Sequence, residues 1–243
     1  MDTAQHLDAL RRDSTALLAA ARRADPAATI EACPGWKPVD LAWHIGEVHW
    51  FWGTVVRDRL TDPDGYLEPA RPATDEDVFA FADESANALV DALASTDPST
   101  AVWTWSKQND VGFVARRMAQ ETAVHRVDAE RAAGADYRID AELAADGVDE
   151  FLEHFLSDVV KGAPPLGGSV HVHCVDVAGE WTVTVDEADT YVVTREHAKG
   201  DAALRGDAHD LLMVLWRRAP LESVDVLGSR DVAERFIART NLD

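Results

Sequence analysis

The chain has 243 residues, of which 47% are apolar and 28% are charged, as in an ordinary soluble protein with a sizeable core. Acidic residues outnumber basic ones 44 to 23, and the formal net charge of −21 argues against nucleic acid and anionic lipid as partners, because both attract clusters of Lys and Arg. No apolar run approaches the roughly 20 residues that span a bilayer, and the first residues do not resemble an export signal, so a cytoplasmic location is expected.

The first two thirds of the chain predict helices, because apolar residues recur there at intervals of three and four. One of these helices starts near Pro38, a favoured first-turn residue, and its apolar line includes Leu41 and Ile45. Another begins after Thr74, whose side chain suits a helix cap. The expected helices span residues 3–24, 38–60, 111–133 and 141–160, with the helix capped by Thr74 between the second and third of them.

A Gly- and Pro-rich stretch at residues 161–168 predicts a linker, and the periodicity changes after it. Alternation of apolar and polar residues then predicts strands in an antiparallel meander, followed by two helices. The expected fold class is therefore α+β, with a helical domain over residues 1–163 and a small α/β domain over residues 164–243. The strands are expected at residues 169–177, 181–185 and 191–194, and the helices at residues 208–218 and 231–239.

Polar side chains interrupt the apolar stripe of the helix expected at residues 111–133. Glu121 and His125 lie one turn apart on this stripe, between Met118 and Ala129, so their side chains project side by side. An unpartnered carboxylate in an apolar layer is costly. A bound cation would supply the missing partner, so the pair predicts two ligands of a metal ion.

A third ligand is expected from a neighbouring helix, as in other metal sites of helical bundles. His44 borders the apolar stripe of the helix at residues 38–60 and is the first candidate, and His49 borders it on the other side and is the second. Two histidines and one carboxylate leave an open coordination position, which is typical of catalytic zinc and also suits ferrous iron. Asp128 lies one turn beyond His125, where it either orients the ligand's other ring nitrogen or forms a surface ion pair with Arg131.

Other residue sets give weaker indications. His171 and His173 share a strand face and suit a metal, although exposed strand histidines are more common than ligands. Arginines that could bind a substrate carboxylate, or simply be solvated at the surface, are Arg205, Arg217 and Arg218.

The two cysteines do not predict a disulfide framework. Cys33 and Cys174 are far apart in sequence, and neither belongs to a Cys-x-x-Cys pair, so both are interpreted as structural thiols. No glycine-rich nucleotide-binding motif and no Gly-x-Ser-x-Gly motif is present, so nucleotide binding and serine-hydrolase chemistry have no support.

Three segments resemble the mycothiol-dependent maleylpyruvate isomerase family, part of the DinB-like metalloenzyme group. They begin with Cys-Pro-Gly-Trp and Asp-Leu-Ala-Trp-His-Ile-Gly in residues 33–46, and continue with residues 117–129 and 202–212. Lys37 departs from the family pattern, which usually has a Ser or Thr helix cap at this place. The resemblance implies a DinB-like four-helix bundle with zinc held by His44, Glu121 and His125, and a smaller α/β domain.

The resemblance also implies a reaction. The thiol of mycothiol would take the open zinc position, ionise there without a general base, and attack an electrophilic small molecule. In the isomerase the thiolate would add to the cis double bond of maleylpyruvate, and rotation and elimination would give the trans product. An arginine would hold a substrate carboxylate, and the candidates for this catalytic role are Arg205 and Arg217.

We therefore expect a zinc-dependent, mycothiol-using enzyme, either an isomerase or a thiol S-transferase, that acts as a monomer or homodimer on a small-molecule thiol and an electrophile. Fold and family do not decide between the two reactions. The alternative is a non-catalytic metal- or thiol-sensing module that binds a partner protein.

Overall fold

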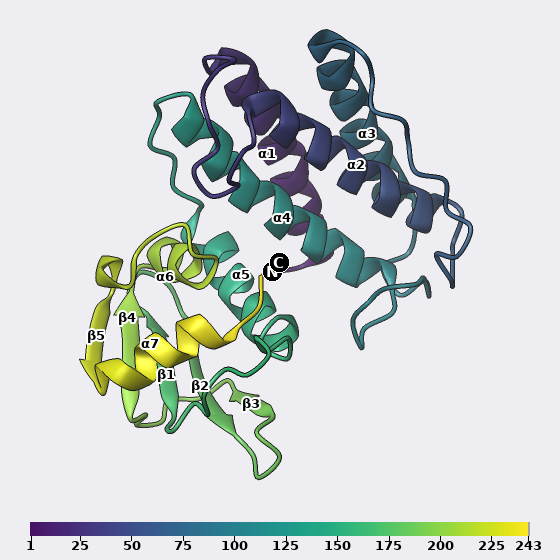
Figure 1. Ribbon diagram of the computed structural model, residues 1–243. Coiled ribbons are helices and arrows are strands. Elements are labelled where there is room, and N and C mark those ends of the chain that lie inside the picture. Colours follow the sequence, from purple (N-terminus) through teal and green to yellow (C-terminus); the bar gives the residue numbers. More distant parts are fainter. Residues whose placement is uncertain (243) are drawn as a thin grey trace. The chain divides into compact units, whose positions relative to one another are not determined.

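Four helices form the first part of the chain in the computed structural model, which describes residues 1–242. The helix α1 packs against α4 and α3, and α2 packs against α3 and α4, so the four make the expected bundle (Figure 1). This unit comprises Met1–Arg138. Among the described residues, no helix combines the length and the apolarity that a membrane span requires. The helices are α1 (Thr3–Arg23), α2 (Pro38–Arg57), α3 (Asp75–Ser95) and α4 (Val111–Ala132).

The starts of α2 and α3 follow from local hydrogen bonds. The hydroxyl of Thr74 accepts a hydrogen bond from the backbone N–H of Asp77 at 3.2 Å, which confirms the predicted cap of α3. Lys37 stands at the cap position of α2, where its backbone N–H donates to the carboxylate of Asp40 at 3.0 Å. Asp40 therefore accepts the N–H of the cap residue, whereas Lys37 gives no side-chain acceptor to the first-turn N–H groups that a Ser or Thr cap would bond, and the helix starts at Pro38 as predicted.

The predicted apolar stripe of α2 lies in the core of the bundle. Leu41 and Ile45 have no exposed surface, and they share a cluster of buried residues with Leu17 of α1 and Ala129 of α4. At Gly46 the backbone of α2 approaches α3 so closely that an added Cβ would lie 3.0 Å from the ring of Phe81. The close approach fixes the position of α2 in the bundle and with it the position of the neighbouring His44.

The second unit, from Ile139 onward, is a five-stranded sheet with helices. The strand order is β3-β2-β1-β4-β5, and the strands pair antiparallel except for β1 and β4, which are parallel. Figure 1 shows α7 crossing the sheet, and α5 packs against α6. The elements are α5 (Ala141–His154), β1 (Val170–Cys174), β2 (Glu180–Val185), β3 (Tyr191–Thr194), β4 (Ala202–Gly206), α6 (Ala208–Leu215), a 3-10 turn (Leu221–Ser223), β5 (Asp225–Gly228) and α7 (Arg230–Arg239).

Two features of this unit differ from the expectations. The sheet is mixed rather than antiparallel, because β4 returns beside β1 in parallel register, with Val172 opposite Leu204. The division between the units falls between residues 138 and 139, whereas the Gly- and Pro-rich linker suggested a boundary between residues 163 and 164. The boundary moves because α5 belongs to the second unit, where the ring of its Phe151 packs edge-on against Trp216 at 5.0 Å between centroids.

The two faces of the sheet have different surroundings. Val170 and Val172 lie fully buried on the face that packs against α6 and α7. His171 and His173 alternate with them along β1 and therefore point to the opposite face. On that opposite face the hydroxyl of Thr182 donates to the carbonyl of Glu196 at 3.2 Å, so the segment after β3 lies over this part of the sheet.

Candidate metal centre

The helices α2 and α4 bring together the three predicted metal ligands. The Nε2 atoms of His44 and His125 each lie 3.3 Å from the same carboxylate oxygen, Oε1 of Glu121. The imidazole rings are 5.1 Å apart between centroids at an angle of 75°, and one ligand atom from each of the three residues lies within 4.8 Å of the others. Two imidazole nitrogens and one carboxylate oxygen so arranged match the donor set of a catalytic zinc ion.

The cluster lies at the edge of the bundle core and keeps access to solvent. The side chain of His125 is 9% exposed, whereas those of Glu121 and His44 are 21% and 30% exposed. The ring of Trp36, from the loop before α2, lies 5.0 Å from the His44 ring. Two of the three candidate ligands are therefore partly exposed to solvent.

Glu121 has a further charged partner on α4, which its place on the apolar stripe did not predict. The guanidinium of Arg117, one turn earlier on α4 and only 5% exposed, forms an ion pair with Glu121 Oε2. Burial favours the neutral carboxyl, but Arg117 and the hydrogen bonds from His125 and His44 outweigh it and hold the pKa of Glu121 well below its usual range. Glu121 is therefore ionised, and its second oxygen remains directed at the two histidines.

Asp128 makes the contact expected of a residue that orients a ligand. Its Oδ2 lies 3.0 Å from Nδ1 of His125, and its side chain is 1% exposed. Burial opposes protonation of His125, but the hydrogen bonds to Asp128 and Glu121 outweigh it and raise the pKa of His125 to about 9. In the metal-free protein His125 is thus a cation, and a bound metal ion would take the place of the Nε2 proton.

His49, the second candidate for the α2 ligand, has a different environment. It is completely buried, and its Nε2 lies 2.9 Å from the hydroxyl of Thr122. Burial lowers the pKa of His49 to about 4, so the ring is neutral. His44, not His49, joins the cluster with Glu121.

The two candidate arginines both belong to the second unit, whereas the cluster belongs to the first. Arg205 lies on β4 with its side chain 50% exposed, and its Nη1 is 3.3 Å from a carboxylate oxygen of Asp225 on β5. Arg217 follows α6 with a φ of 57°, and its guanidinium donates to the carbonyls of Ile237 (2.9 Å) and Thr240 at the end of α7. Arg217 therefore links the end of α6 to the end of α7.

Cys33 is nearer to the cluster than its interpretation as a structural thiol implied. Its sulfur, a ring nitrogen of His125 and a carboxylate oxygen of Asp128 also lie within 4.8 Å of one another. Cys33 lies in the loop before α2, the helix that carries His44, and this position is the one sequence feature that could have placed it near the cluster. The residue spacing does not show that this loop lies beside α4. Cys33 thus lies beside the face of His125 that Asp128 occupies.

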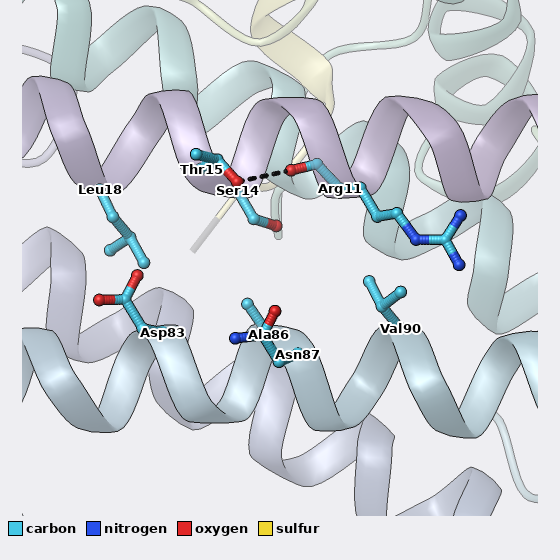
Figure 2. A pocket seen from close by; sticks show the side chains of 8 residues that line it. All are labelled: Arg11, Ser14, Thr15, Leu18, Asp83, Ala86, Asn87 and Val90. Atoms are coloured by element: carbon cyan, nitrogen blue, oxygen red, sulfur yellow. Dashed lines mark hydrogen bonds between the residues drawn. The ribbon is translucent and has the colours of Figure 1, made fainter.

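A pocket of about 270 Å³ lies elsewhere in the bundle, between α1 and α3 (Figure 2). The hydroxyl oxygen of Ser14 is buried there without a hydrogen-bond partner, whereas that of Thr15 donates to the carbonyl of Arg11 at 3.0 Å. No histidine or cysteine lines the pocket, so Ser14 has no general base of that kind beside it. The lining residues are Arg11, Ser14, Thr15, Leu18, Asp83, Ala86, Asn87 and Val90.

Comparisons with known proteins agree with this description. Residues 7–130 match the family profile described as the mycothiol maleylpyruvate isomerase N-terminal domain, and residues 142–235 match the profile described as the MDMPI C-terminal domain. No curated protein matches the chain. A crystal structure of the mycothiol-dependent maleylpyruvate isomerase matches with a TM-score of 0.58 and 14% identity over 93% of each chain. A histidine-to-alanine mutant of that enzyme gives 0.58 and 12% over the same share, and both likenesses show the fold.

Proposed function

This chain belongs to the mycothiol maleylpyruvate isomerase family, and on that premise we propose that it is a zinc-dependent enzyme in which the thiol of mycothiol attacks an electrophilic small molecule. The reaction is either the isomerisation of a compound like maleylpyruvate or the transfer of the thiol to an electrophile. The proposed metal ligands are His44, Glu121 and His125.

The observation that supports a metal ion is that histidines from two different helices approach the same carboxylate oxygen. His44 from α2 and His125 from α4 both direct Nε2 at Oε1 of Glu121 at 3.3 Å. Two imidazoles and a carboxylate fit zinc and leave a coordination position for an exogenous ligand. A zinc ion there would lower the pKa of a thiol that occupies this position, which supplies a nucleophile near neutral pH.

The residues around the ligands prepare them for this role. Asp128 holds Nδ1 of His125 in a hydrogen bond, so Nε2 keeps its direction toward Glu121. Arg117 keeps Glu121 ionised and occupies its other oxygen. The chain therefore supplies one carboxylate oxygen and two oriented ring nitrogens and needs no general base for the thiol.

Of the two candidates for binding a substrate carboxylate, we propose Arg205 rather than Arg217. The side chain of Arg205 is half exposed and has one ion pair, with Asp225, so a carboxylate can approach it. The guanidinium of Arg217 is occupied by two backbone carbonyls of the α7 end. A bidentate contact from Arg205 to the carboxylate would hold an α-keto acid such as maleylpyruvate.

Turnover tests the proposal. Purified protein supplied with zinc and mycothiol should consume maleylpyruvate or members of a panel of electrophiles such as epoxides, haloalkanes and activated alkenes. The His125→Ala variant is the control and should be inactive. Binding of zinc and mycothiol without conversion of any compound would contradict the proposal and favour a non-catalytic metal- or thiol-sensing module.

A further inference from the structure

A second group of metal-ligating side chains lies in the second unit, on the sheet face opposite α6 and α7. His173 Nδ1 is 2.6 Å from Glu180 Oε1, and His197 Nδ1 is 2.8 Å from Glu180 Oε2. His171 Nε2 is 3.8 Å from the same Oε2. One donor atom from each of the four residues lies within 4.8 Å of the others, so four ligands surround one small volume.

The strand register explains why these residues meet. His171 and His173 are alternate residues of β1 and share a face, and Glu180 of β2 is the register partner of His173. His197 comes from the segment between β3 and β4, which is tied to the sheet by the hydrogen bond from Thr182 to the carbonyl of Glu196. The four residues meet only because distant segments pair in the sheet. The His-x-His pattern of β1 alone therefore does not indicate that Glu180 and His197 lie beside it.

The cluster has more donor atoms than a single carboxylate can satisfy. His171 is 8% exposed, and its buried Nε2 has no hydrogen-bond partner. His173 Nδ1 also makes no hydrogen bond, although Glu180 Oε1 lies 2.6 Å away as an ion-pair partner. A buried ring nitrogen without a partner is unfavourable by roughly 1–3 kcal/mol, and a cation at the focus of the cluster would remove this cost.

We propose that His171, His173, Glu180 and His197 form a second metal site, which binds a divalent transition metal of the zinc type. Three imidazoles and one carboxylate suit zinc, nickel and copper, whereas magnesium and calcium prefer oxygen ligands. Four protein ligands complete a tetrahedral shell, so this site is closed and holds structure rather than a substrate. Its function is to fasten the segment that carries His197 to β1 and β2.

This inference is independent of the proposed function, because the four residues lie apart in sequence and structural unit from His44, Glu121 and His125. It is tested by titrating the metal-depleted full-length protein with Zn²⁺ in equilibrium dialysis. Glu180→Gln should bind one equivalent fewer than the wild type. Glu196→Gln, which makes the same change at an exposed residue beside His197, should bind as much as the wild type.

A second variant guards against a general loss of folding. The side chain of His197 is 76% exposed, so His197→Asn removes a ligand with little effect on packing. The His125→Ala variant lacks the first site. Addition of Co²⁺ to it should still give the absorption of one tetrahedral ion and raise the melting temperature. The double variant with His197→Asn should show neither effect. A zinc stoichiometry unchanged from the wild type in both Glu180→Gln and His197→Asn would overturn the proposal, as would complete loss of metal from His125→Ala alone.

Discussion

Oδ2 of Asp128 lies 3.0 Å from Nδ1 of His125, one turn further along α4. Because the Asp128 side chain is almost fully buried, water does not screen this contact. It fixes the orientation of the ring and stabilises a proton on it in the metal-free protein. The proposed metal centre is therefore set up by a residue that is not one of its ligands.

Asp128→Asn should weaken zinc binding about 10- to 100-fold, because the second ring nitrogen of His125 loses its charged acceptor. The change should also lower the pKa of His125 from its value of about 9. A competition titration with a zinc chelator measures the first effect and an NMR titration of the imidazole the second. An unchanged zinc affinity would show that Asp128 does not support a ligand.

Zinc binding should release protons and become tighter as pH rises toward about 9, because the ion displaces a proton from His125. The pKa of His125 is raised from 6.5, so in the metal-free protein its stabilising contribution is complete below pH 6.5 and is lost as pH rises through 9. Calorimetry in buffers of different ionisation enthalpy measures the protons released. Absence of proton release at pH 7 would contradict the assigned protonation of His125.

His49 should make the protein less stable in acid. Its folded-state pKa of about 4 lies below the ordinary 6.5, so the stability that it contributes is present above pH 6.5 and is lost as pH falls toward 4, by up to about 3 kcal/mol. Urea unfolding at pH 4 to 7 should show this slope in the wild type and a smaller one in His49→Gln. His49→Gln should also retain its zinc, since His49 is not a proposed ligand; loss of zinc would restore His49 as a candidate.

The helical stripes predicted the bundle and pointed to α2 and α4 as the source of the candidate ligands, but they left His44 and His49 as alternatives on α2. Leu41 and Ile45 lie in the core as their spacing predicted, and the neighbouring His44 lies 3.3 Å from Glu121 of α4. Arg117 was missed because an arginine four residues before a glutamate is typical of a solvated surface pair. Here the same spacing places a buried cation on Glu121.

The second unit was less predictable, because its arrangement depends on contacts between distant segments. The apolar face of α5 predicts burial but does not identify its partner, which is α6. The strand β4, Ala202–Gly206, has few β-branched or aromatic residues, so its sequence does not indicate a strand beside β1. Without β4 in parallel register the predicted sheet could only be antiparallel.

Arg205→Ala should affect substrate binding, whereas Arg217→Ala should affect the stability of the fold. Arg205→Ala should raise the KM for a carboxylate-bearing substrate and leave the melting temperature nearly unchanged, because its side chain is half exposed. Arg217→Ala should lower the unfolding free energy by about 1 kcal/mol, because two backbone carbonyls lose a charged donor at a solvent-exposed position. Steady-state kinetics and thermal unfolding of both variants measure these effects, and an unchanged KM in Arg205→Ala would exclude it as the carboxylate-binding residue.

The central claim is that His44, Glu121 and His125 hold a metal ion with a position open to a thiol. The most direct test is the absorption spectrum of the cobalt-substituted protein as mycothiol is added. Sulfur-to-cobalt charge-transfer bands should appear in the wild type and in Cys33→Ser, and should be absent in His125→Ala. Cobalt bound in the wild type without such bands, or equal bands in His125→Ala, would contradict the account.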